Sequence, residues 1–252
     1  MRRYLSAVLL CCLLAGAAAA GPNEPLRVAV ASNFLPVARA LAERFEQAQG
    51  QQVVLVPGAT GRLYAQIRHG APFDVFLAAD RERPERLERE GLAVKDTRQT
   101  YAVGRLVLWS PDPQRIGDPQ QTLSRADFHR LAIANPRLAP YGRAAQQTLQ
   151  RLGLWQALSR KLVRGENIAQ AFHFVRSGNA ELGFIAAAQW QALDAARKGS
   201  AWQVPQTLHE PIEQQLVLLR DRPSARAFLE WLRMPEAREL IRAGGYEVPT
   251  DG

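Results

Sequence analysis

Two stretches in the first half of the chain place small or hydroxyl residues between an apolar strand and the start of a helix. The apolar residues 28–31 run into Ser32 and Asn33, and the apolar residues 53–56 run through a Pro-Gly-Ala turn into Thr60. A helix start carries unpaired backbone N–H groups and about half a positive charge, so it binds anions without lysine or arginine. The alternative is that Ser32 and Thr60 are ordinary helix N-caps.

Two stretches in the middle of the chain have the same form. Residues 138–142 place Tyr141 at the start of one predicted helix, and residues 165–168 place Ile168 at the start of another. Four such helix starts directed at one point would hold a small anion by hydrogen bonds alone. The residues therefore predict an anion site built from neutral donors.

Strands and helices alternate along the whole chain, which is typical of α/β folds with mostly parallel sheets and helices on both faces. Two long apolar strands, 101–109 and 212–219, bracket a middle set of smaller units that includes a short helix near 126–130. This order predicts that the chain leaves one lobe, builds a second and returns, with two crossover strands as a hinge. Ligands bind at the carboxyl ends of strands in such sheets, so we expect the four helix starts in the cleft between the lobes.

The N-terminus has the form of a secretory signal peptide over residues 1–20. Arg2 and Arg3 precede an apolar run over 5–14 and a small-residue cleavage site ending at Ala20, and the run is too short to span a membrane. We therefore expect a periplasmic protein. The rest of the chain divides into two predicted lobes: lobe 1, residues 21–102 with 217–252, and lobe 2, residues 103–216.

Composition narrows the class of protein. Cys11 and Cys12 both lie in the predicted signal peptide, so the exported chain has no disulfide and must be stabilised by its core. The formal net charge is +8, two units of which belong to the signal peptide. Arginine alternates with glutamate over residues 80–90, which is typical of a solvated helix face and not of a nucleic-acid-binding patch. We therefore expect no nucleic-acid partner.

Segments spread over the exported chain also carry a family resemblance: 28–34, 58–67, 70–80, 104–110, 131–136, 182–185 and 245–246. They resemble the periplasmic molybdate-binding proteins of bacterial molybdate ABC transporters. The resemblance implies a two-lobed periplasmic-binding-protein fold of type II and an oxyanion held in its cleft. The positions that match the family's ligand contacts are Ser32, Asn33, Thr60, Tyr141 and Ile168.

The resemblance also implies the partners of the protein. Molybdenum would be bound as the oxyanion, with no direct protein ligand to the metal and no cofactor. Molybdate and tungstate are so alike in size and charge that we expect both to bind. The other expected partner is the membrane permease of the ABC transporter, and we expect a monomer.

One departure bears on the donor set. A branch of the family has a tyrosine at the position of Ala186, whereas this chain has its tyrosine at 141, like a branch that also has asparagine at the position of Asn33. Tyr141 can therefore contribute either its hydroxyl or its backbone N–H.

Three other interpretations compete with this one, of which one is a sensor or scaffold that binds the transporter and little else. An enzyme would need a nucleophile with a base, but there is no Gly-x-Ser-x-Gly motif, and the histidines are scattered. Asp74 and Asp80 would lie about 20 Å apart on an extended strand, too far for paired acid–base work, and Asp80 is better explained as a helix cap. A receptor for sulfate, phosphate or a small carboxylate stays open, because Arg62 and Arg143 follow two of the helix starts.

Overall fold

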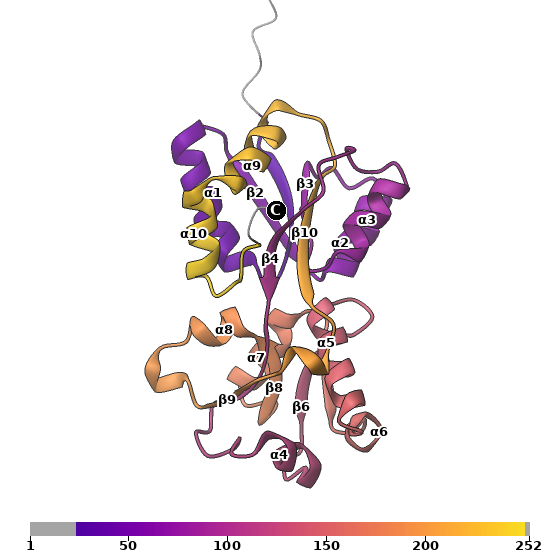
Figure 1. Ribbon diagram of the computed structural model, residues 1–252, viewed down its shortest axis with the longest axis vertical. Helices are drawn as coiled ribbons and strands as arrows, with labels where there is room; N and C mark the ends of the chain where they lie inside the picture. The colour runs from indigo at the N-terminus through magenta and orange to yellow at the C-terminus, as the bar shows by residue number, and fades with distance from the viewer. Residues whose placement is uncertain (1–23, 250–252) are drawn as a thin grey trace, which may run out of the picture.

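The chain folds into two lobes stacked end to end, each built on a five-stranded sheet (Figure 1). The computed structural model describes residues 24–249, so the predicted signal peptide lies outside the described residues. The expected two-lobed α/β architecture is confirmed. Among residues 24–249, none of the helices combines the length and the apolar character needed to cross a membrane.

Lobe 1 has the strand order β2-β1-β3-β10-β4. Its strands are β1 (Leu26–Ala31), β2 (Val53–Gly58), β3 (Val75–Leu77), β4 (Gln99–Gly104) and β10 (Ile212–Leu218). Its helices are α1 (Leu35–Gln49), α2 (Thr60–Arg68), α3 (Glu82–Arg89), α9 (Pro223–Arg233) and α10 (Pro235–Ala243). Helices α1, α9 and α10 cover one face of the sheet, and α2 and α3 cover the other (Figure 1).

Lobe 2 has the strand order β7-β6-β8-β5-β9. Its strands are β5 (Leu106–Ser110), β6 (Leu131–Ala134), β7 (Leu162–Gly165), β8 (Leu182–Ala186) and β9 (Ser200–Gln203). Its helices are α4 (Pro119–Arg125), α5 (Pro140–Arg151), α6 (Trp155–Leu158), α7 (Ile168–Arg176) and α8 (Ala187–Gln191), with 3-10 turns η1 (Ala195–Arg197) and η2 (Gln206–Leu208). Leu149 of α5 packs on one face of this sheet, and Phe172 of α7 packs against Trp109 on the other.

Both sheets are mixed, whereas the alternation of elements predicts mostly parallel ones. In lobe 1, β1 runs parallel to β2 and β3, and β10 runs antiparallel to β3 and β4. In lobe 2, β6 is parallel to β7 and β8, and β5 is antiparallel to β8 and β9. The antiparallel pairings arise because β5 and β10 carry the chain away from the cleft, while the neighbouring strands run towards it.

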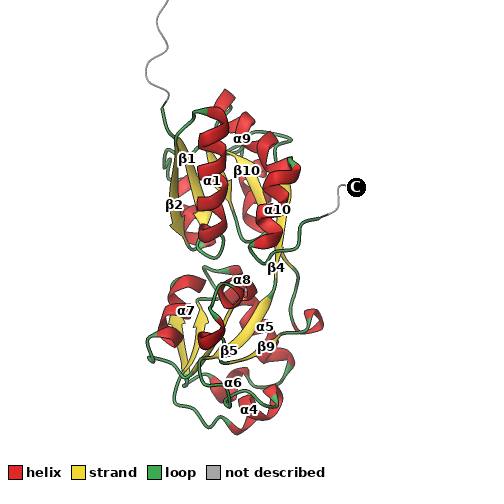
Figure 2. Ribbon diagram, turned by 90° about the vertical axis from the view of Figure 1, so that its left-hand side faces the viewer, coloured by secondary structure: helices red, strands yellow, loops and turns green. Residues whose placement is uncertain are grey.

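The lobes are joined where the chain crosses between the sheets (Figure 2). The single strand predicted over 101–109 is two strands in different sheets, because β4 ends at Gly104 and β5 begins at Leu106. The chain returns through β10, whose pairing with β4 shifts register between Gln214 and Gln215. Strands β4 and β10 thus form the hinge, with an irregularity at Gln214.

Local sequence signals explain where the helices begin. Proline occupies the first or second position of five helices, where its missing N–H costs nothing: α1, α4, α5, α9 and α10. The Asp118 carboxylate accepts a hydrogen bond from the Gln121 N–H at 2.9 Å and so caps α4. Ala126 then ends α4 with a positive φ of 54°. The helix predicted near 126–130 is therefore wrong, since the helix lies just before that stretch.

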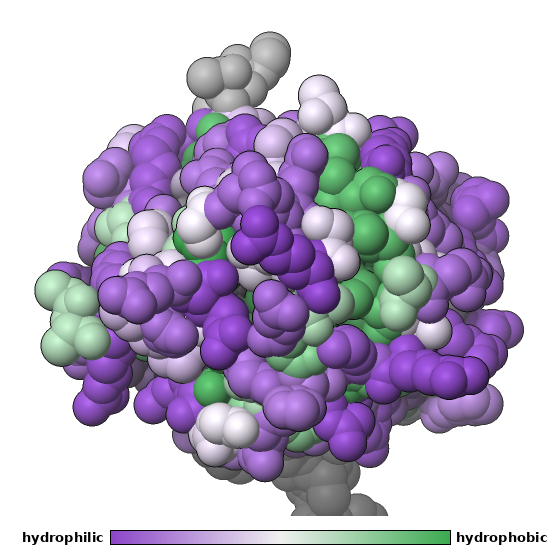
Figure 3. All heavy atoms as spheres, turned by 90° about the horizontal axis from the view of Figure 1, so that it is seen from below, coloured by the Kyte–Doolittle hydropathy of each residue, from purple (hydrophilic) through white to green (hydrophobic). Residues whose placement is uncertain are grey.

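The outer end of lobe 2 is mostly hydrophilic, with a larger hydrophobic area on the right of the view and smaller ones on the left (Figure 3). Among the described residues, only Leu92 and Met234 are large hydrophobic side chains with high exposure. Most large apolar side chains of both lobes are thus buried in the hydrophobic cores.

Candidate anion-binding site between the lobes

A small pocket lies between the lobes at the four predicted helix starts. It is lined by Ala31, Ser32, Asn33, Gly58, Ala59, Thr60, Ala79, Ala139, Pro140, Tyr141, Asn167 and Ile168. All five residues predicted from the sequence are in this set. The structure therefore brings together residues that are up to 136 positions apart in the chain, from Ser32 to Ile168.

The sheets explain why the four helix starts meet. In lobe 1, the ends of β1 and β2 lie side by side, with Ala31 paired to Gly58. In lobe 2, the ends of β6 and β7 do the same, with Ala134 paired to Gly165. Each of these strands leads into a helix, and the carboxyl ends of parallel strands share one edge of the sheet. Both edges face the cleft, so two helix starts from each lobe point at the pocket.

Backbone N–H groups are the first set of donors at the pocket. Thr60 and Ile168 are the first residues of α2 and α7, and Tyr141 is the second residue of α5. N–H groups at these positions have no acceptor within their own helix. These three and the N–H of Asn33 have no other hydrogen-bond partner within residues 24–249. Four backbone donors are therefore free to bind an anion.

Hydroxyl groups supply the second set of donors. Thr60 is 1% exposed, and its Oγ1 accepts a hydrogen bond from the Ala79 N–H at 3.2 Å, which leaves the hydroxyl proton free to donate. Ser32 is partly exposed, and its hydroxyl makes no hydrogen bond within the described residues. Neither residue caps a helix, because the N-cap positions of α1 and α2 are Phe34 and Ala59. The alternative that Ser32 and Thr60 are ordinary N-caps is thus excluded.

The Tyr141 hydroxyl lies on the hinge side of the pocket. It is enclosed by protein on the hinge side, where it packs against the backbone of Gly104. Burial raises the pKa of Tyr141 well above its ordinary value near 10, so the group is neutral in the physiological range. Of the two possibilities left open by the sequence, the backbone N–H in the first turn of α5 is therefore the better candidate donor.

Asn33 connects the pocket to the hinge. Its Nδ2 donates to Gln214 Oε1 at 2.8 Å and to the Tyr246 hydroxyl at 3.1 Å, and that hydroxyl donates to the Asn33 carbonyl oxygen at 2.8 Å. Asn33, Gln214 and Tyr246 are all buried. The sequence analysis did not find Gln214 and Tyr246 as site residues, because they lie 181 and 213 positions from Asn33 and have no local motif.

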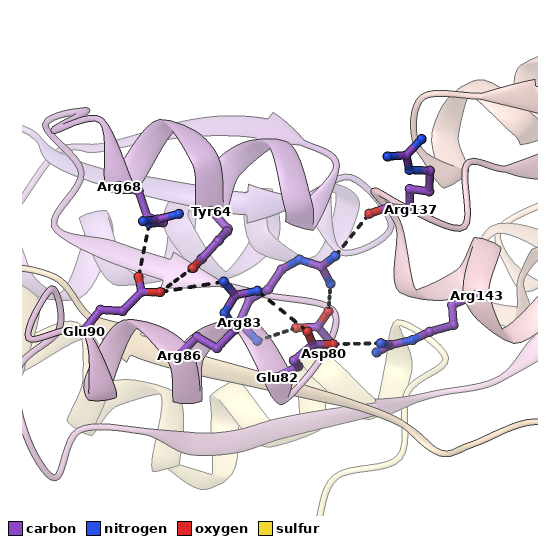
Figure 4. Close-up of polar contacts among 9 residues, drawn as sticks. All are labelled: Tyr64, Arg68, Asp80, Glu82, Arg83, Arg86, Glu90, Arg137 and Arg143. Atoms are coloured by element: carbon purple, nitrogen blue, oxygen red, sulfur yellow. Dashed lines mark hydrogen bonds and ion pairs between the residues drawn. The ribbon is translucent and has the colours of Figure 1, made fainter.

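No charged side chain lines the pocket among the described residues. Arg62 and Arg143, which follow two of the helix starts, are paired with carboxylates of the opposite lobe. Arg62 binds Glu166 at 2.7 Å, and Arg143 binds Glu82 at 2.8 Å (Figure 4 shows the second pair). The hydrogen bond from Arg143 lowers the pKa of Glu82. Both guanidinium charges are thus neutralised across the cleft.

Further contacts hold the lobes together beside the pocket. The Gly61 N–H donates to the Leu138 carbonyl oxygen at 2.8 Å, and Arg83 reaches the Arg137 carbonyl oxygen at 3.4 Å (Figure 4). A Cβ atom at Gly61 would lie 3.0 Å from that same Leu138 oxygen, so the close approach of the two backbones favours glycine. The two lobes are therefore in direct contact beside the pocket, as in a closed form.

Asp80 lies at the edge of this contact region. Its carboxylate accepts a hydrogen bond from the Arg83 N–H at 3.1 Å and forms an ion pair with the Arg83 side chain. Burial raises the pKa of Asp80 despite the charge of Arg83. Asp80 thus binds an N–H group in the first turn of α3, but the N-cap position itself is Arg81, one residue after the expected cap.

The other chemistries considered have little support in the structure. Within residues 24–249, no three histidine, cysteine, aspartate or glutamate side chains are grouped so that they could hold a metal ion. Asp74 is fully buried and is bound by Arg222 at 3.1 Å and by the Arg27 N–H at 2.8 Å, so it serves the fold of lobe 1. The donor set at the pocket can bind an anion, but it offers no general base.

Comparisons with known proteins agree with this geometry. A family model described as bacterial extracellular solute-binding protein matches residues 26–247. The chain is 48% identical over 232 residues to the molybdate-binding protein ModA of Azotobacter vinelandii, with 91% of this chain and 92% of the relative covered. It is 43% identical over 249 residues to ModA of Rhodobacter capsulatus, with 98% and 96% covered.

A solved structure of a molybdate-binding protein also resembles this chain in its fold. The periplasmic molybdate-binding protein of Azotobacter vinelandii superposes with a TM-score of 0.84 at 40% sequence identity, covering 89% of this chain and 100% of that chain. The similarity thus extends over both lobes and the hinge.

Proposed function

This chain belongs to the family of bacterial extracellular solute-binding proteins, which are not enzymes, and we propose that it captures molybdate for an ABC importer. The relatives named above are molybdate-binding proteins at 48% and 43% identity over nearly their whole length. The observation that carries the proposal is the convergence of two helix starts from each lobe on one pocket without charged side chains.

The donors at this pocket suit a fully deprotonated oxyanion. A buried dianion is costly unless its oxygens receive hydrogen bonds. Hydrogen bonds to a charged group contribute roughly 1.5–3 kcal/mol each, so several of them offset that cost. The proposed donors are the free N–H groups of Asn33, Thr60, Tyr141 and Ile168, the hydroxyls of Ser32 and Thr60, and the side chain of Asn33.

The same donors provide selectivity. A protonated anion such as hydrogen phosphate would turn its own proton towards a donor, and no carboxylate lines the pocket to accept it. Sulfate has the right charge but is smaller, so it would not contact donors from both lobes at once. Tungstate matches molybdate in size and charge, and we propose that it binds equally well.

The remaining parts of the proposal concern location and partners. Residues 1–20 direct export, with cleavage near Ala20, and the mature protein acts in the periplasm as a monomer. It delivers its ligand to a membrane permease. The family membership and the periplasmic relative support this proposal.

Titration calorimetry on the chain from residue 21 tests the function. Molybdate and tungstate are expected to bind tightly with one site per chain, and sulfate and phosphate at least a hundredfold more weakly. Asn33→Ala, which removes a predicted donor, is expected to weaken molybdate binding. Equal affinity for sulfate or preference for phosphate would assign the protein to a different anion.

A further inference from the structure

The contact between Asn33 and Gln214 determines which atom Asn33 presents to the pocket. With Nδ2 bonded to Gln214 and Tyr246, both amide protons of Asn33 are used inside the protein. The remaining amide atom, Oδ1, makes no hydrogen bond within residues 24–249 and is not enclosed by protein, and Asn33 lines the pocket. In this arrangement Asn33 offers an acceptor where an anion needs a donor.

Two neighbouring polar atoms are buried without a hydrogen-bond partner. They are Gln214 Nε2 and the Tyr141 hydroxyl, and they lie together beside Gly104. Gln214 is fully buried and Tyr141 is 1% exposed. A buried polar group without a hydrogen bond lowers the stability of the folded state. An arrangement in which both of these groups are hydrogen-bonded is therefore favoured.

A half turn of both carboxamides supplies that arrangement. A carboxamide changes little in shape when its oxygen and nitrogen exchange places, but its donors and acceptors are reversed. After the turn, Gln214 Nε2 donates to Asn33 Oδ1, and Gln214 Oε1 accepts from the Tyr141 hydroxyl. Tyr101, whose hydroxyl lies 3.3 Å from Gln214 and donates to the Ala78 carbonyl oxygen, becomes an acceptor for the second proton of Gln214. The Tyr246 hydroxyl then lies beside both Asn33 Oδ1 and the Asn33 carbonyl oxygen, and it can donate its proton to either one.

We propose that Gln214 is a positioning residue that turns the Asn33 carboxamide so that Nδ2 faces the bound anion. A chain of donors then runs from the Tyr141 hydroxyl through Gln214 and Asn33 to the ligand. This inference rests on the proposed function, since it assumes an oxyanion in the pocket. It adds Gln214 to the residues that determine affinity, although Gln214 does not touch the ligand.

The position of Gln214 links this chain of donors to closure of the lobes. Gln214 lies on the hinge strand β10, at the register shift against β4. Tyr141 belongs to lobe 2, whereas Asn33 belongs to lobe 1, and Gln214 lies between them. The chain of donors is therefore complete only when the two lobes are closed, so the orientation of Asn33 and the closure of the cleft stabilise each other.

Gln214→Met tests the proposal, with Gln215→Met as its matched control. Both glutamines are buried neighbours on β10, but Gln215 bonds Thr100 at 3.0 Å and Arg98 at 2.9 Å, away from the pocket. Gln214→Met is expected to raise the Kd for molybdate roughly tenfold, the equivalent of one hydrogen bond. Gln215→Met is expected to lower the melting temperature and leave the Kd within twofold.

A double-mutant cycle separates positioning from a general structural effect. If Gln214 acts through Asn33, Gln214→Met changes the Kd less than twofold in the Asn33→Ala background. Gln214→Glu is expected to bind more weakly than Gln214→Met, because a carboxylate accepts from Asn33 Nδ2 and keeps Oδ1 towards the pocket. Additive effects of Gln214→Met and Asn33→Ala would overturn the proposal, as would wild-type affinity in Gln214→Met.

A spectroscopic measurement on the wild-type protein gives an independent result. The side-chain NH2 resonances of Asn33, assigned by their loss in Asn33→Ala, are expected to shift when molybdate is added. Unchanged resonances at saturation would also overturn the proposal. If the wild-type protein does not bind molybdate in calorimetry, the proposed function itself fails, and that outcome is distinct from the failure of the positioning role.

Discussion

Replacing Thr60 by valine removes one predicted donor from the pocket while keeping the volume of the side chain. Thr60 begins α2 and is 1% exposed, so no water replaces its hydroxyl at a bound ligand. Its Oγ1 already accepts from the Ala79 N–H, which directs the hydroxyl proton away from that bond. We expect this proton to donate to the anion.

The expected size of the effect follows from these contacts. A hydrogen bond to a charged group contributes roughly 1.5–3 kcal/mol, so the Kd for molybdate should rise about ten- to a hundredfold in Thr60→Val. The variant also leaves the buried Ala79 N–H without an acceptor, so the unliganded protein should lose about 1–3 kcal/mol of stability. A loss of stability alone is therefore not evidence for ligand contact.

Thr148→Val is the matched control for this variant. Thr148 is fully buried in α5, and its hydroxyl donates to the Ala144 carbonyl oxygen at 2.8 Å, outside the pocket. Both variants should melt below the wild type, but only Thr60→Val should bind molybdate more weakly in calorimetry. A Kd within threefold of the wild type in Thr60→Val would refute the assignment of this hydroxyl to the anion.

Three further outcomes are expected. Molybdate at a hundredfold above its Kd should stabilise the protein by about 2.7 kcal/mol in thermal unfolding, and sulfate at the same concentration should have little effect. Affinity should be flat between pH 6 and 8, because neither histidine nor carboxylate lines the pocket among the described residues. It should fall in acid, because Arg143 lowers the pKa of Glu82 in the closed form and protonation of Glu82 breaks the Glu82–Arg143 pair between the lobes. A steep change between pH 6 and 8 would contradict this. Gly104→Ala places a methyl group against the Tyr141 hydroxyl and should weaken binding about 5- to 150-fold by opposing closure, detectable as a more open form in X-ray scattering; a compact, tightly binding variant would exclude that role of Gly104.

The pocket could be predicted from the sequence because its geometry follows from local patterns and one general rule. Each helix start is marked by a strand, a small-residue turn and the first residue of a helix, as at Thr60 and Ile168. The rule that parallel strands end at the same edge then brings these starts together. No side-chain detail was needed for that step.

The direction of individual side chains could not be predicted in this way. Whether the Tyr141 hydroxyl points into the pocket depends on the space left by Gly104, which belongs to another lobe. Gln214 and Tyr246 reach Asn33 only through the tertiary fold. Buried polar groups far apart in sequence have no periodicity that a linear pattern could show.

Two errors in the predicted elements have local causes. The apolar run over 101–109 continues through the lobe boundary, since both β4 and β5 are buried strands, and only Arg105 separates them. The helix predicted near 126–130 lies too far along the chain, because the true helix start is marked by Asp118 and the proline that follows it at the start of α4.

The return of the chain through β10 has a consequence for the order of folding. Strand β10 lies between β3 and β4, so without it the sheet of lobe 1 is divided into a three-stranded part and a lone strand. Lobe 2 is a continuous segment between β5 and β9 and contains all five strands of its own sheet. Contacts that close over long sequence separations form slowly. Lobe 1, which is synthesised first, is therefore completed last. Until β10 is in place, the edges of β3 and β4 are exposed to pairing with other chains.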